Sequence, residues 1–208
     1  MKAVEMELSL TKEEMEYARK FLKREPNPLE WAMIDTEWSE HCSYKSSKPV
    51  LKLLPTRGKR VLLGPGYDSG VIDIGDGYVA TAHIESHNHP SAIDPYGGSA
   101  TGIGGVIRDI LCMGTRPIAL LDSLRFGSIE ESEHSRWLFK YVVRGIADYG
   151  NCTGIPTVAG EVEFDESFEK NCLVDVVCLG VGRKKDLVLA EASNLGDVVI
   201  LVGGSTGR

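Results

Sequence analysis

The first fifty residues carry apolar side chains at helical spacing. Thr11-Lys12-Glu13-Glu14 matches a capping box, which predicts a helix that begins there and ends before Pro26-Asn27-Pro28. A second helix is expected to start at Pro28 and to run toward Ser39-Glu40-His41-Cys42. The apolar stripes are Met15, Ala18 and Leu22 in the first helix and Trp31, Ile34 and Trp38 in the second. We therefore expect a small helical linker region over residues 1–50.

Beyond this region the pattern changes to short apolar runs bounded by glycine. Gly75-Asp76-Gly77 predicts a tight hairpin turn between runs at 71–74 and 78–85. The second run alternates, so His83 and Glu85 should point to the same face of the sheet. Further strands are expected at 61–63, 117–124, 173–181 and 198–202, and helices at 106–113 and 133–149. The run 173–181 is nearly all apolar, which predicts a strand covered on both faces.

The run 198–202 leads into a glycine-rich end, Gly203-Gly204-Ser205-Thr206-Gly207-Arg208. A strand and a glycine-rich turn normally feed a helix, and a helix N-terminus commonly holds phosphate. The second half of that element is absent, so we expect this chain to be part of a longer enzyme.

Size and composition limit the class of protein. With 208 residues and 42% apolar content, the chain can bury one full core or two small ones, so we expect a single α/β domain over residues 51–208 after the N-terminal helices. A net charge of −7 argues against nucleic-acid or acidic-membrane partners. Five cysteines without a CxxC pair indicate reduced thiols and a cytoplasmic protein, and no apolar run is long enough to span a membrane.

The densest group of polar side chains is Glu85-Ser86-His87-Asn88-His89-Pro90-Ser91, at the end of a predicted strand. Each of these groups would need its own partner if it were buried, which favours a functional site over a core. The alternative is a polar loop in which His87 and His89 only cap neighbouring backbone groups.

The glycine-rich stretch 97–105 before Arg108 and Asp109 is a second candidate. Glycines and a helix start let backbone N–H groups approach an anion, and Arg108 could bind a phosphate in a bidentate way. The same glycines could instead serve close packing of a helix on a strand.

Glu85 and Asp109 are oxygen ligands from two different elements, which suits Mg²⁺ bound jointly with nucleotide phosphates. The alternative pairs Asp109 with Arg108 or Arg116. Zinc held by His41 and Cys42 with one of the downstream histidines fits no familiar zinc spacing. A nucleophilic Cys42 would need a base that the sequence does not identify.

Together these strings resemble the phosphoribosylformylglycinamidine synthase family, in the order of that family and over nearly the whole chain. The matching strings are Ser39-Glu40-His41-Cys42-Ser43-Tyr44, Ile84-Glu85-Ser86-His87-Asn88-His89-Pro90-Ser91, Ala100-Thr101-Gly102-Ile103-Gly104-Gly105-Val106-Ile107-Arg108-Asp109, Gly145-Ile146-Ala147-Asp148-Tyr149-Gly150-Asn151, Gly154-Ile155-Pro156-Thr157-Val158 and the glycine-rich end.

The resemblance implies specific roles. His41 would be a catalytic histidine and His87 the proton acceptor, and Tyr44 and the position of His83 would touch ATP. Glu85 and Asp109 would bind Mg²⁺. The residues implied to hold the substrate, formylglycinamide ribonucleotide, are Ser86, His87, Asn88, His89 and Arg108. Many members carry lysine where this chain has His83, and an imidazole supplies that charge only when it is protonated.

The implied activity is that of an ATP-dependent C–N ligase of purine biosynthesis. It transfers the γ-phosphoryl group of ATP to the substrate amide oxygen, after which ammonia attacks the activated carbon to form an amidine. Members with this N-terminal layout look to a glutaminase subunit and a small accessory subunit for ammonia.

The implied fold is the ATP-binding domain of the aminoimidazole ribonucleotide synthetase-like superfamily. It is an α+β fold with an antiparallel-rich sheet, helices on one face and a helical linker before it. Two such sheets pack together, so the apolar face of a single sheet predicts a homodimer. The competing interpretations are an ATP-binding or dimerisation fragment that is inactive alone, and another ATP-dependent ligase or kinase of the same superfamily.

Overall fold

The computed structural model describes residues 8–191 and 193–204, and the chain divides into two compact units. The first unit is Met1–Pro55 and the second is Thr56–Arg208. The glycine-rich end predicted to hold phosphate falls largely on residues 205–208, which lie outside the described residues.

The first unit consists of short helices held by side-chain caps. The helix α1 (Lys12–Leu22) has the predicted capping box, in which the Thr11 hydroxyl accepts from the Glu14 N–H at 3.2 Å. The helix α2 (Pro28–Glu37) has a second capping box, between Asn27 and Glu30. Leu10, Ala18 and Trp31 form the buried core of this unit.

The second helix is shorter than predicted, since it was expected to run toward Ser39-Glu40-His41-Cys42. It ends at Glu37, and Ser39 in an extended conformation caps a separate helix α3 (Glu40–Ser43) by accepting the Cys42 N–H. A serine hydroxyl that binds a backbone N–H three residues on favours a new helix start over continuation of the old one. A further short helix, α4 (Lys48–Leu51), follows.

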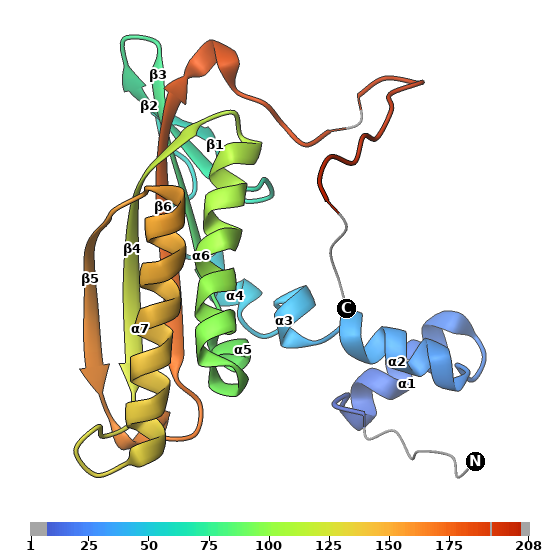
Figure 1. Ribbon diagram of the computed structural model, residues 1–208. Coiled ribbons are helices and arrows are strands. Elements are labelled where there is room, and N and C mark those ends of the chain that lie inside the picture. Colours follow the sequence, from blue (N-terminus) through green and yellow to red (C-terminus); the bar gives the residue numbers. More distant parts are fainter. Residues whose placement is uncertain (1–7, 192, 205–208) are drawn as a thin grey trace. The chain divides into compact units, whose positions relative to one another are not determined.

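A six-stranded sheet forms the second unit, in the order β1-β2-β3-β6-β4-β5 (Figure 1). The strands are β1 (Val61–Leu63), β2 (Gly70–Gly75), β3 (Tyr78–Ser86), β4 (Arg116–Phe126), β5 (Thr157–Phe164) and β6 (Leu173–Arg183). Only the β4–β5 pair is parallel, so the expected antiparallel-rich sheet is confirmed.

The hairpin between β2 and β3 forms where it was predicted. Asp76 and Gly77 both have positive φ, 51° and 76°, which is the requirement of a type I′ turn. This turn sets the register in which Val79 lies opposite Asp73, and so it decides which β3 side chains face the helices.

Two long helices, α6 (Pro95–Cys112) and α7 (Glu133–Thr153), cover one face of the sheet (Figure 1). The core lies between them and strands β4 and β6. Its fully buried members include Ile103 and Ile110 of α6, Leu138 and Val142 of α7 and Val176 of β6. The expected arrangement of helices on one face is therefore confirmed. None of the described helices is long and apolar enough to cross a membrane.

None of the described helices of the second unit covers the opposite, open face of the sheet, which corrects the prediction that 173–181 is covered on both faces. Along β6 buried and half-buried residues alternate, with Val174, Val176 and Cys178 toward the helices. The side chains of the open face include Ile72, Ala82, Ile84, Val177 and Leu179, and Ile84 is 65% exposed.

Other elements differ from the predicted ones. The run 198–202 is not a strand but exposed chain, because none of the described strands pairs with it. The strand β5 was not predicted, and neither was the short helix α5 (Asn88–Ile93), which begins inside the polar string. Two single turns of 3-10 helix, Glu166–Phe168 and Lys184–Asp186, flank β6.

Candidate functional site

The candidate residues of the second unit lie along a seam where β3 packs on α6. His83 Nε2 lies 3.1 Å from Asp109 Oδ2. Two residues further along the strand, the Glu85 carboxylate lies directly against Gly105, where a β-carbon would collide with it. The strand and the helix thus run in opposite directions with matched positions, and Glu85 and Asp109 face the same seam.

Glycine at position 105 makes the room for Glu85. Gly105 and Asp109 are one helical turn apart on the same face of α6, a spacing of about 5–6 Å. The next turn toward the N-terminus brings Gly102 against His87, with only 3.1 Å between its β-carbon position and His87 Cβ. Glycines on this helix face therefore let the side chains of Glu85 and His87, at the end of β3, lie beneath it.

The glycine-rich stretch is not a phosphate cradle at a helix start, which corrects that prediction. The helix α6 begins at Pro95, and its first turn is capped by Asp94, whose carboxylate accepts from the Gly97 N–H at 3.1 Å. Residues 97–105 are therefore inside the helix, where the N–H groups from Gly98 onward bind backbone carbonyls. The packing alternative holds for these glycines, since Gly98 and Gly104 also contact neighbouring chain closely.

Asp109 pairs with His83, and not with Arg108 or Arg116 as the alternative would have it. Burial raises the pKa of the Asp109 carboxyl group above its ordinary value; His83 and Arg108 lower it, and the nearby Asp68 carboxylate raises it. A cation near two carboxylates would stabilise their charged form.

The polar string after Glu85 is partly structural. The Asn88 side-chain oxygen accepts from the Val174 N–H at 2.6 Å, which ties the end of β3 to β6. The Ser91 hydroxyl, fully buried, donates to the His87 carbonyl at 2.6 Å. These contacts hold the backbone that follows His87, and they occupy the Asn88 side-chain oxygen and the Ser91 hydroxyl.

His87 has an unsatisfied buried atom. Its Nδ1 is enclosed and has no hydrogen-bond partner among the described residues. Ser86, by contrast, belongs to the open face by strand alternation and is exposed, and His89 is exposed as well. The structure therefore brings Glu85, His87 and Asp109 to one seam and leaves Ser86 on the other side of the sheet.

Two residues that sequence reasoning missed lie at the start of β2. Asp68 acts on the Asp109 carboxylate, and Ser69 is 2% exposed with a hydroxyl that has no partner among the described residues. Their signal in the sequence is the glycine-bounded string Gly64-Pro65-Gly66-Tyr67-Asp68-Ser69-Gly70 just before a strand.

In the first unit, His41 lies in α3 and Tyr44 is the residue that ends this helix. Tyr44 has a left-handed backbone, with φ 53°, and its ring is 54% exposed. Glu40 organises this turn, because its carboxylate accepts from the Ser46 N–H at 2.7 Å and from the Ser47 hydroxyl at 2.6 Å. The Ser47 and Ser46 hydrogen bonds lower the pKa of Glu40 to about 2. The hydrogen bonds of the Glu40 carboxylate thus hold the turn next to His41.

The described residues contain no group of three or more His, Cys, Asp and Glu side chains placed to hold a metal ion. A divalent ion at Glu85 and Asp109 would need further oxygen ligands from a nucleotide or from water.

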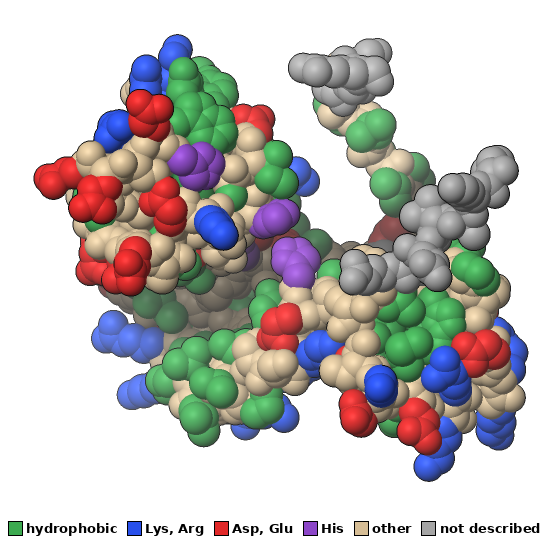
Figure 2. All heavy atoms as spheres, turned by 90° about the horizontal axis from the view of Figure 1, so that it is seen from below, with side chains coloured by type: hydrophobic (Ala, Val, Ile, Leu, Met, Phe, Trp, Pro, Cys, Tyr) green, Lys and Arg blue, Asp and Glu red, His purple; other side chains and the backbone are tan. Residues whose placement is uncertain are grey.

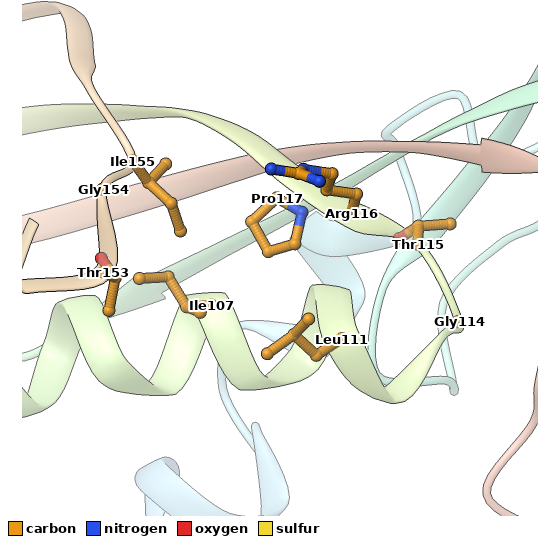
Figure 3. Close-up of a pocket in the computed structure, with 9 residues that line it drawn as sticks. All are labelled: Ile107, Leu111, Gly114, Thr115, Arg116, Pro117, Thr153, Gly154 and Ile155. Carbon is orange, nitrogen blue, oxygen red and sulfur yellow. The ribbon is translucent and has the colours of Figure 1, made fainter.

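Some features of the surface lie away from the seam. A cavity of about 700 Å³ opens between the C-terminal end of α6 and the start of β4, and its lining includes Leu111, Arg116 and Pro117 (Figure 3). It includes none of the candidate residues. Histidine side chains reach the surface on the face shown in Figure 2, and His41 and His89 are among the exposed residues of the chain.

Comparison with known protein families identifies the type of domain that the second unit contains. Residues 66–182, which hold every candidate from His83 to Asp109, match the AIR synthase related protein, N-terminal domain. The chain belongs to this family. Residues 2–45 match the formylglycinamide ribonucleotide amidotransferase linker domain, so the AIR synthase related domain follows a linker of that type.

The sequence of this AIR synthase related chain is similar to those of known proteins over almost all of its length. Phosphoribosylformylglycinamidine synthase subunit PurL of Methanothermobacter thermautotrophicus is 60% identical over 96% of the chain. Among solved structures, T. maritima PurL complexed with ATP is 40% identical with a TM-score of 0.73, covering 89% of this chain and 30% of that one. The same PurL complexed with FGAR is 41% identical with a TM-score of 0.73, covering 89% and 28%. PurLQS from Thermotoga maritima is 41% identical with a TM-score of 0.69, covering 88% and 28%.

The likeness to PurL is therefore to one part of that protein. This AIR synthase related chain spans 28% of the length of the Methanothermobacter relative.

Proposed function

We propose that this chain supplies the helical linker, residues 1–50, and the first ATP-binding domain, residues 51–208, of a phosphoribosylformylglycinamidine synthase. Such an enzyme uses ATP and ammonia to convert formylglycinamide ribonucleotide to formylglycinamidine ribonucleotide. Support comes from the 60% identity to a PurL subunit and from the PurL structures that hold ATP and FGAR.

The observation that carries the proposal is the seam between β3 and α6. The Glu85 carboxylate fills the space that a β-carbon on residue 105 would take, and Asp109 lies one helical turn away. Two hard oxygen ligands at one seam fit Mg²⁺, which keeps several water or phosphate ligands. When bound there, Mg²⁺ would neutralise the phosphates of the nucleotide.

Arg108 and His87 supply the polar groups for the substrate. Arg108 is exposed next to Asp109, and among the described residues no carboxylate forms an ion pair with it, so its guanidinium can bind a phosphate in a bidentate way. His87 lies at the same seam, with a buried Nδ1 that has no hydrogen-bond partner among the described residues, and its imidazole would take the proton at the reacting amide. His89 and the amide N–H₂ of Asn88 would add contacts at the same end of β3.

In this mechanism the chain positions groups and manages protons. His87 takes a proton as ammonia nitrogen bonds to the activated carbon, and the phosphate formed from the amide oxygen leaves. His41, on the exposed α3 turn, is the second catalytic histidine of the proposal, and Tyr44 offers an exposed ring for the nucleotide. Ser86 contributes through its backbone, because its side chain lies on the open face.

The partners in this proposal are a glutaminase subunit and a small accessory subunit that deliver ammonia. Its support is the likeness to a chain of the PurLQS structure. We place the protein in the cytoplasm, since its five cysteines are all free in the described structure.

The open sheet face supports an additional proposal, a homodimer. It exposes apolar side chains of three neighbouring strands, among them Ile72, Ile84 and Leu179. An exposed apolar face that extends over neighbouring strands often marks a surface for another protein.

A second candidate function is an ATP-binding or dimerisation part that is inactive alone. It is favoured by the share of the PurL relative that this chain spans, 28%.

Binding and turnover separate the candidates. Calorimetry of the 208-residue chain with formylglycinamide ribonucleotide, and with ATP and Mg²⁺, should show binding, weakened at least about tenfold in His87→Ala for the former and in Glu85→Gln for the latter. His134→Ala, on α7, is the matched control. Release of ADP on addition of ammonium supports the complete activity, and binding without release supports the second candidate. If neither ligand binds, the synthase and the ATP-binding part are both refuted, and a chain that dimerises without binding either ligand is the dimerisation part.

A further inference from the structure

The start of α6 and the first half of α7 line a second cavity, of about 550 Å³. Its lining residues are Asp94, Pro95, Tyr96, Trp137, Tyr141 and Arg144. Aromatic and apolar walls with a few polar groups, in a cavity of this size, are typical of a site for a small molecule. None of these residues belongs to the seam between β3 and α6.

The aromatic rings provide surface on which a flat ligand can stack. Trp137 and Tyr141 lie one turn apart on α7, with ring centroids 6.2 Å apart and planes tilted by 59°. Trp137 is 40% exposed, so part of its ring surface is available to a ligand. Tyr96 contributes a third ring from α6. Stacking on such rings accepts any planar base, because every base has a π-face.

The Arg144 guanidinium supplies the positive charge of this cavity. It lies over the Tyr96 ring, with Cζ 5.9 Å from the centroid, and its Nε is 3.5 Å from Asp148 Oδ2. The Tyr96 hydroxyl donates to the same Asp148 oxygen at 3.2 Å. None of the described residues accepts a hydrogen bond from the guanidinium, and the Arg144 side chain is 63% exposed. Its terminal nitrogens can therefore bind a phosphate in a bidentate way.

The Asp94 carboxylate supplies an acceptor. Its Oδ1 accepts from the Gly97 N–H at 3.1 Å, and none of the described residues donates to Oδ2. An N–H group on the edge of a base can donate to that oxygen. Asp94 and Asp148 also limit the negative charge of a ligand, because each further phosphate beside Arg144 would be repelled by two carboxylates. One phosphate group is therefore favoured over three.

We propose that this cavity binds a nucleoside monophosphate, with the base stacked on Trp137 and Tyr141 and the phosphate held by Arg144. Asp94 accepts from the N–H edge of the base. Binding requires no divalent ion, because a side chain carries the positive charge. The site is separate from the nucleotide site proposed at the seam and does not depend on it.

Calorimetry of the 208-residue chain with guanosine monophosphate (GMP) tests the proposal. EDTA is present, so that the divalent ion of the proposed seam site is removed. We expect saturable binding that Arg144→Met weakens about tenfold or more, since a charge-assisted contact is lost. Trp137→Leu should weaken it about fivefold or more, and Trp137→Phe should retain most of the affinity.

Arg183→Met is the matched control. The Arg183 guanidinium likewise lies over a tyrosine ring, 5.3 Å from the centroid of Tyr78, but it does not line the cavity. This variant should bind GMP as the unchanged chain does. Circular dichroism verifies that each variant is folded.

Indole N–H signals in nuclear magnetic resonance spectra locate the bound GMP. The chain has 3 tryptophans, and Trp31 and Trp38 belong to the first unit, so only the Trp137 signal should shift. The signal that disappears in Trp137→Phe identifies it. A Trp137 signal that stays in place at saturating GMP would overturn the proposal.

Three calorimetric results would also overturn it. The first is the absence of saturable GMP binding, or equal affinity in Arg144→Met and the unchanged chain. The second is inorganic phosphate binding as tightly as GMP, because the base would then contribute nothing. The third is GMP binding that is lost in Glu85→Gln and kept in Arg144→Met, since the nucleotide would then occupy the seam.

Discussion

The hydroxyl groups of Thr81 and Thr115 form a buried pair at the edge of the seam. Their oxygens are 2.7 Å apart, and the two residues are 1% and 3% exposed. Thr115 also donates to the Ile110 carbonyl at 2.9 Å, so Thr81 must be the donor within the pair. One hydrogen-bond chain thus ties β3 to the end of α6, close to His83 and Asp109.

The two threonines should respond differently to removal of the hydroxyl. Thr81→Val leaves Thr115 with its own donor bond intact and should cost about 1 kcal/mol or less of the free energy of unfolding. Thr115→Val leaves the buried Thr81 hydroxyl without an acceptor. This change should lower the free energy of unfolding by about 1–3 kcal/mol. Urea denaturation followed by circular dichroism measures both. Equal losses would contradict the donor assignment.

At the scale of elements, the packing of α6 depends on its glycines. Glycine inside a helix costs about 1 kcal/mol relative to alanine, so its repeated use here requires a compensating gain. The gain is close approach, because α6 lies against the α5 backbone at Gly98, His87 at Gly102 and Glu85 at Gly105. At these positions the poor helix propensity of glycine is outweighed by the close packing of α6 against the α5 backbone, His87 and Glu85.

Two alanine substitutions in α6 should therefore have different effects. A β-carbon on Gly98 would stand 2.6 Å from the backbone nitrogen of Ser91, which cannot move away, so Gly98→Ala should lose about 1–3 kcal/mol. A β-carbon on Gly104 would meet the Tyr149 hydroxyl at 2.9 Å, and that side chain is 38% exposed and can swing outward.

Gly104→Ala should accordingly be nearly neutral, since the gain in helix propensity offsets a small displacement. Thermal unfolding of both variants is the measurement, with Gly104→Ala in a Tyr149→Phe background as the control. Similar melting temperatures for Gly98→Ala and the unchanged chain would show that the α5 backbone yields.

At the scale of the whole molecule, the two faces of the sheet differ in burial. The apolar residues of its strands do not indicate which face is covered. Val176 is fully buried toward the helices, whereas Ile84, on the open face, is 65% exposed. Both are large apolar residues in central strands. The open face is the surface that a second sheet could cover in the proposed homodimer.

A charge on the open face should prevent association without unfolding the chain. We expect Ile84→Asp to be a folded monomer where the unchanged chain is a dimer, because an ionised carboxylate cannot be buried in an apolar interface cheaply. Size-exclusion chromatography with light scattering gives the mass, and circular dichroism verifies the fold. Val176→Asp is the contrasting control and should unfold. A monomeric unchanged chain would refute the homodimer.

The amino-acid sequence by itself determined part of the local structure. Capping residues and apolar spacing located α1, the Asp76-Gly77 turn located the hairpin, and strand alternation put His83 and Glu85 on one face. These features depend on neighbours within a few residues. The site assignments themselves stay predictions.

Tertiary structure decided what those residues face. Whether Asp109 meets Arg108, Arg116 or His83 depends on how α6 lies on β3, and that is set by clearance at Gly102 and Gly105, not by spacing along the chain. The same holds for the glycine-rich stretch, which the sequence pattern could not distinguish from a phosphate loop, and for β6, whose apolar run does not reveal that only one of its faces is covered. Periodicity determines which face of an element a side chain occupies, but only packing between elements determines its partner.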